Sequence, residues 1–193
     1  RFPLDRSSAA SDVYKRQDEG IYPLPIFSVE SLIYSQEAQC AVAVQQADTL
    51  GIDSQTLLDG ARDAAIESIK VQAAKEHLAS RLAERQMRDQ VLSSLPTRHE
   101  LIAQTQPVLN VAIPSTYPDE LARLSGMVGA SDIHGIVSRY PVRESRILDC
   151  IAKGLRFNSR DDYERAVLRR VGVDAKLRDA LKQKLGNLAS QLE

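Results

Sequence analysis

Ser28 and Glu30 are the first residues of this sequence whose types and spacing could do chemistry. They directly follow an apolar run over residues 21–27. In open α/β sheets, functional side chains gather where strands end, and a carboxylate there can bind Mg²⁺, which takes oxygen ligands and draws few of them from the protein. The pair is therefore a candidate metal site. A glutamate in the first turn of a helix is also favoured by the helix dipole alone, and the pattern by itself favours this second interpretation.

A basic stretch offers a second kind of chemistry. Residues 139–184 hold thirteen Lys or Arg against seven Asp or Glu, an excess of six positive charges in a chain whose net charge is -1. A basic face near a metal site would suit the phosphate backbone of a nucleic acid. The candidate contacts are Arg143, Arg146, Arg169 and Arg170. The alternative is a solvated helical surface with charges paired at helical spacing.

Other catalytic signatures are absent from the sequence. It contains no GxxxxGK loop, no GxGxxG, no CxxC and no nucleophile elbow, and its three histidines lack the spacing of metal ligands. Cys40 and Cys150 lie among apolar residues and are expected to be reduced, buried thiols of a cytoplasmic protein. No stretch approaches the ~20 apolar residues that span a bilayer, so no membrane partner is expected.

The composition predicts the elements that must position these residues. Of the 193 residues 43% are hydrophobic and only 5% aromatic, with no Trp, so the core must consist of Leu, Ile, Val and Ala. Such a core suits packed helices. The predicted fold class is mainly α, with one or two residual strands over residues 21–27 and 109–113. Pro23 and Pro25 each remove a ladder donor, which places the first strand at a sheet edge.

Capping residues and periodicity predict the helices. Ser28 can cap a helix that begins at Val29, and a second helix over 36–50 should stop at Gly51. A third begins at Asp53 or Ser54 and keeps its apolar spacing to about residue 95, either as one helix that would reach ~60 Å or as a hairpin. Five shorter helices are predicted over residues 118–127, 132–140, 144–155, 159–171 and 174–192.

The N-terminal residues do not read as folded sequence. Residues 1–17 lack periodicity, and SSAASDVYKRQ resembles translated sequencing-adapter read-through, so they are predicted to be disordered and are excluded from fold reasoning. A disordered native tail is the alternative. Since one apolar strand precedes an almost entirely helical remainder, we expect a C-terminal piece of a larger protein.

Two segments resemble one family. GIYPLPIFSVESLIYSQEAQCAVA is similar to the end of the Toprim domain in ATP-binding proteins of the overcoming-lysogenization-defect (OLD) type, and IVSRYPVRESRILDCIAKGLRFNSRDDYERAVLRRVGVDAKLRDAL is similar to their helical C-terminus. The resemblance implies a truncated Toprim-like α/β end over residues 18–52, a long helix or hairpin over 53–95 and a helical region over 96–193. It also implies an ATPase-coupled, Mg²⁺-dependent nuclease, often in antiphage defence, that cleaves DNA or RNA and forms homo-oligomers.

The resemblance carries over only part of a catalytic site. Ser28 and Glu30 match the family's Ser-x-Glu motif, and Arg143 would supply a basic group to the phosphate site. The family's early Glu, its Asp-x-Asp pair and its ATPase domain would lie upstream. Because two-metal catalysis needs several carboxylates, this chain is expected to be inactive alone. The alternative function is a non-catalytic helical interaction module that docks a partner or an ATPase domain, in which Glu30 is only a first-turn residue.

Overall fold

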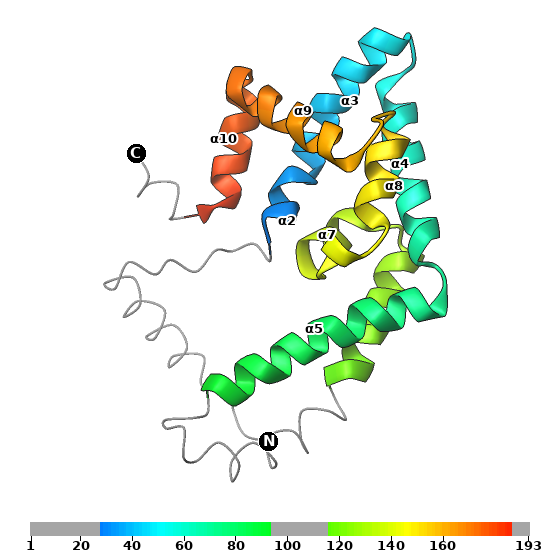
Figure 1. Ribbon diagram of the computed structural model, residues 1–193, viewed down its shortest axis with the longest axis vertical. Helices are drawn as coiled ribbons and strands as arrows, with labels where there is room; N and C mark the ends of the chain where they lie inside the picture. Colours follow the sequence, from blue (N-terminus) through cyan, green and yellow to red (C-terminus); the bar gives the residue numbers. More distant parts are fainter. Residues whose placement is uncertain (1–27, 94–115, 187–193) are drawn as a thin grey trace, which may run out of the picture.

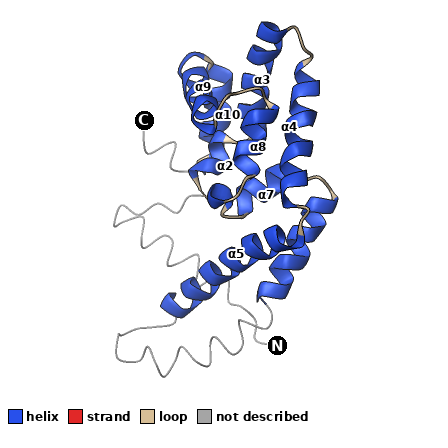
Figure 2. Ribbon diagram, turned by 45° about the vertical axis from the view of Figure 1, so that its right-hand side comes forward, coloured by secondary structure: helices blue, strands red, loops and turns tan. Residues whose placement is uncertain are grey.

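The computed structural model describes residues 28–93 and 116–186, whose regular structure is entirely helical (Figures 1 and 2). The mainly α fold class is therefore confirmed. The two predicted strands, over 21–27 and 109–113, and the tail over 1–17 lie outside the described residues.

Within residues 28–93 and within residues 116–186, the helices follow one another with short connections. Their bounds are α2 Val29–Ile33, α3 Gln36–Leu50, α4 Ser54–Ile69, α5 Gln72–Ser93, a helix over 116–129, α7 Ile133–Arg139, the 3₁₀ turn η2 Val142–Glu144, α8 Ile147–Gly154, α9 Arg160–Val173 and α10 Ala175–Lys184. None of the helices in this part of the chain combines the length and the apolar character that crossing a membrane requires.

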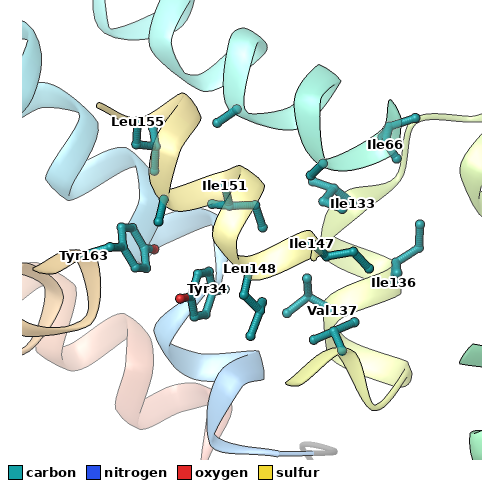
Figure 3. Close-up of a cluster of buried hydrophobic side chains, with 14 of the residues drawn as sticks. Tyr34, Ile66, Ile133, Ile136, Val137, Ile147, Leu148, Ile151, Leu155 and Tyr163 are labelled. Atoms are coloured by element: carbon teal, nitrogen blue, oxygen red, sulfur yellow. The ribbon is translucent and has the colours of Figure 1, made fainter. Parts of the chain in front are cut away.

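The core is built around α8. This short helix packs most extensively on α4, and Leu148 and Ile151 are fully buried. In Figure 3 the α8 side chains reach Tyr34 and Tyr163 on one side and the isoleucines of α7 on the other. The two tyrosine rings stack with centroids 4.7 Å apart. Gly154 permits the close crossing, because a Cβ atom there would overlap the backbone of Ala61.

The long helical segment after Asp53 is divided in two, so the interpretation as one unbroken helix is wrong. α4 ends at Ile69, and α5 leaves it at an angle after Lys70 and Val71 (Figure 1). Near this bend the Ser68 hydroxyl donates to the carbonyl of Ala65 at 2.6 Å. Each half buries its own apolar face, with Ile69 on α4 and Leu78 on α5, and the bend lets both faces meet the core.

Most predicted helix ends are confirmed because they depend on local chemistry. Asp53, Ser159 and Asp174 each accept a hydrogen bond from the backbone N–H three residues later, and Gly51 ends α3 at φ 66°. Ser28 occupies the N-cap position of α2, but its side chain makes no capping bond.

The two cysteines, Cys40 and Cys150, are free thiols, as predicted, but both are half-buried instead of buried. Burial raises the pKa of Cys40, with a smaller contribution from the charge of Glu37. The Cys40 thiol is therefore protonated at neutral pH.

Candidate functional site

Glu30 is held between two arginines. It lies in the first turn of α2, its side chain is only 12% exposed, and its Oε1 atom is 3.5 Å from both Arg143 Nε and Arg160 Nη2. Arg143 belongs to η2, and Arg160 is the first residue of α9. The carboxylate therefore joins three elements that are far apart in sequence.

Arg160 extends this arrangement into a network. Its Nε donates to Glu164 Oε1 at 2.6 Å, and its Nη1 donates to the carbonyl of Arg143 at 3.3 Å. Burial alone would lower the pKa of Arg160, but Glu164 and further negative groups outweigh it and raise the pKa. Tyr34 donates to the same Glu164 oxygen at 3.2 Å, and burial raises its pKa far above the usual range. We call Glu30, Tyr34, Arg143, Arg160 and Glu164 the Glu30 cluster.

The donor set at Glu30 does not by itself fit Mg²⁺. Within residues 28–93 and 116–186, no three His, Cys, Asp or Glu side chains lie close enough together to hold a metal ion. Ser28 is half-buried, and the Glu30 carboxylate pairs with two guanidinium cations. Positive charges at this distance repel a divalent cation, so the described residues alone would bind it weakly.

The four arginines predicted to contact nucleic acid do not gather at Glu30. Arg143 reaches it, whereas Arg146 lies exposed next to the α4–α5 bend. Arg169 is exposed on α9, and Arg170 pairs with Asp174 at 3.3 Å. The last two arginines follow Arg160 by nine and ten residues, which puts them about 14 Å farther along the helix axis.

A second charged cluster was not found from the sequence. Glu120, on the helix over 116–129, has a side chain only 7% exposed, and both of its oxygens are bound by Arg139 at the end of α7, with Nε at 3.1 Å from Oε2. The hydroxyl of Tyr140 donates to the backbone carbonyl of Glu120 at 3.1 Å and lies 3.2 Å from its Oε2. Gln86 of α5 donates to Oε1 at 3.4 Å. We call these four residues the Glu120 cluster.

At neutral pH, Glu120 is ionised and Tyr140 is protonated, as expected for groups that hold helices together. Burial would raise the pKa of Glu120, but the hydrogen bonds from Arg139 and Gln86 outweigh it, and the pKa is lowered. Burial and the neighbouring carboxylate raise the pKa of Tyr140 to about 12. At neutral pH the cluster is therefore a fixed ion pair with a neutral tyrosine donor, which fastens α5 and the helix over 116–129 to α7.

One sequence signal could have revealed Glu120. Glu120, Leu124 and Val128 follow one another at intervals of four residues and so lie on one face of the helix, and the two apolar residues are buried. A carboxylate in an apolar helical stripe must find a partner. The Arg160–Glu164 pair, at i,i+4 spacing, had a similar local signal.

Comparisons with protein-family models, with curated proteins and with solved structures find no match for this chain. Its function must therefore be argued from its own residues, and the resemblance to OLD-type proteins stays a prediction.

Proposed function

We propose that this chain is a non-catalytic helical module that docks a partner protein or domain. The observation that carries this proposal is the sharing of the Glu30 carboxylate by Arg143 and Arg160. The one acidic residue that the sequence nominated for metal chemistry is thereby engaged in joining α2 to η2 and α9. Such an ion pair fixes the packing of helices without requiring a ligand.

The shape of the chain supports a docking role. α5, Gln72–Ser93, runs away from the body formed by α4 and α8 (Figures 1 and 2). Arg81, Arg85 and Arg88 are exposed on it at helical spacing. An elongated helix with one charged exposed side offers a surface to another chain, and the Glu120 cluster anchors it to the remainder.

Thermal unfolding with and without Mg²⁺ tests this proposal. We expect Glu30→Gln to lower Tm by the same amount in both conditions, and Mg²⁺ to leave the Tm of the wild type unchanged at matched ionic strength. The matched control is Glu67→Gln, since Glu67 is an exposed glutamate that pairs with Lys70, the C-cap residue of α4. A ligand that binds the folded state raises Tm. A rise with Mg²⁺ that disappears in Glu30→Gln would overturn the proposal.

The second candidate is the end of a Mg²⁺-dependent Toprim nuclease of the OLD type. The observation that favours it is the position of Arg143, which is 78% exposed and lies beside Glu30, where a phosphate group would need a cation. Both arginines approach Oε1 of Glu30. In this proposal the remaining carboxylates, the ATPase domain and the DNA or RNA substrate belong to a longer cytoplasmic protein, in which Glu30 and Ser28 complete the metal site.

This second candidate has its own test. In a protein that joins this chain to an ATPase and a complete Toprim core, Glu30→Ala should abolish metal-dependent cleavage of DNA or RNA and leave the helix content unchanged. Cleavage at the wild-type rate in that variant would exclude a catalytic role for Glu30.

A further inference from the structure

Two cavities lie along the contact between α5 and the turn η2. The first, of about 440 Å³, lies at the α4–α5 bend, and the second, of about 230 Å³, lies farther along α5. Glu144 lines both cavities, so they are neighbours. We call the two together the α5 seam.

The two ends of the seam differ in chemistry. The first cavity is lined by Ile69, Val71, Ala74 and Leu78, and Val71 is 64% exposed. His77, Glu144 and Arg146 also lie on its lining. An apolar side chain that reaches this cavity would remove the exposed Val71 from water, which is favourable in proportion to the area covered.

The second end is basic. Arg81, Arg85, Arg88 and Arg143 line the second cavity together with two carboxylates, those of Glu84 and Glu144. Arg81 already pairs with both, at 3.4 Å and 3.1 Å respectively. Arg143 pairs with Glu30 outside the cavity. The four arginines and two glutamates of the lining itself carry a net positive charge, and guanidinium groups have the planar geometry that suits carboxylates.

We infer that the α5 seam binds an acidic–apolar peptide segment of a partner protein, with its carboxylates at the arginine end and its apolar side chains at the α4–α5 bend. This inference rests on the proposed docking function and names the chemistry of the partner. A nucleic acid suits the seam less well, because no Phe, Tyr or Trp lines either cavity to stack on bases.

Fluorescence polarisation with a defined probe tests the inference. The probe is a fluorescein-labelled peptide with three glutamates at one end and a Leu-Ile-Leu sequence at the other. Arg88→Glu should weaken its binding about tenfold, because an attractive charge becomes a repulsive one. Val71→Asp should weaken binding by a similar factor, and since Val71 immediately precedes α5, aspartate there is compatible with the helix start.

Two matched controls make the same chemical changes elsewhere. Arg165→Glu reverses an exposed charge on α9, and Val173→Asp replaces a valine that is 79% exposed at the end of α9. Both should bind the probe as the wild type does, and circular dichroism should show equal helix content in all four variants. Absence of probe binding, or equal weakening in variants and controls, would overturn the inference.

Single-stranded oligothymidylate serves as the competing probe. If it binds more tightly than the peptide and loses its binding in Arg88→Glu, the seam is a nucleic-acid site and the peptide inference fails. The Mg²⁺ unfolding experiment at Glu30 is independent of these measurements. A rise of Tm with Mg²⁺ that depends on Glu30 would overturn the non-catalytic proposal. If Mg²⁺ has no such effect and the peptide does not bind, only the inference about the α5 seam fails.

Discussion

Glu30 and Glu120 are both nearly buried glutamates paired with arginine, and they differ in how many hydrogen bonds their carboxylates receive. Glu120 receives both arms of Arg139, a tyrosine hydroxyl near one oxygen and an amide at the other, and its side chain is 7% exposed. Glu30 meets two arginines at 3.5 Å through a single oxygen, and one of them, Arg143, is 78% exposed. The carboxylates of Glu30 and Glu120 are therefore buried to a similar extent, but they differ greatly in the hydrogen bonds that they accept.

The difference bears on which glutamate can take a second role. A buried charge with every lone pair engaged is costly to disturb and contributes to the packing of the helices. A carboxylate that meets its partners at longer distances, one of them solvated, can exchange a partner with little loss of stability. Glu30, and not Glu120, is therefore the carboxylate that could meet an additional group in a larger assembly.

Removing the charge of Glu120 should have the largest effect. We expect Glu120→Gln to lower the free energy of unfolding by about 3 kcal/mol, because it leaves the half-buried Arg139 without its anion. Urea denaturation measures the loss. Asp119→Asn is the control, since Asp119 is the exposed neighbour on the same helix, and it should change stability by less than ~0.5 kcal/mol. An effect of Glu120→Gln no larger than the control's would mean that the ion pair contributes no stability.

The corresponding change at Glu30 should be smaller. Glu30→Gln is expected to cost about 1 kcal/mol, because Arg143 is solvated and Arg160 keeps its bond to Glu164. The same urea experiment gives the value. A loss as large as that of Glu120→Gln would show that the Glu30 cluster is an anchor of equal strength and would end the distinction between the two.

The stability that the Glu120 carboxylate contributes should depend on pH in the acid range. The pKa of Glu120 is lowered in the folded protein, whereas the pKa of a glutamate in the unfolded chain is about 4.3. The stabilisation is therefore complete above about pH 4.3 and is lost as the pH falls through the folded pKa. The free energy of unfolding should be measured for the wild type and for Glu120→Gln from pH 7 downwards. The difference between the two proteins should stay constant at first and then become smaller in acid. A difference that stays constant in acid would contradict the lowered pKa.

The sequence predicts what depends on neighbours along the chain. The helix starts predicted at residues 53, 159 and 174 and the stop at Gly51 are confirmed, because each depends on a bond or a backbone angle within a few residues. The sequence did not decide between one helix and a hairpin over residues 53–95, because no Gly or Pro marks the bend between α4 and α5. The bend allows α4 and α5 to bury two separate apolar faces.

The candidate site was predictable only in part. Placing Arg143 near Glu30 came from the resemblance, and the structure does bring the two within 3.5 Å, although what they do together is untested. Arg160 was missed because its contact with Glu30 depends on how α9 packs against α2. Arg139 and Glu120 are 19 residues apart and meet only because α7 folds back. Tertiary packing, and not local pattern, decides such pairs.

Salt should produce the smallest effect, and it tests the comparison most directly. The screening length falls from about 10 Å at 0.1 M to about 3 Å at 1 M, which weakens a solvated pair more than a buried, hydrogen-bonded one. The cost of Glu30→Gln should therefore drop by about 0.5 kcal/mol in 1 M NaCl, while the cost of Glu120→Gln should stay nearly unchanged. Urea denaturation at both salt concentrations measures each difference. If salt reduced the destabilisation by Glu30→Gln and by Glu120→Gln equally, salt would screen the two carboxylates to the same extent. Glu30 would then be no freer than Glu120 to accept a new partner.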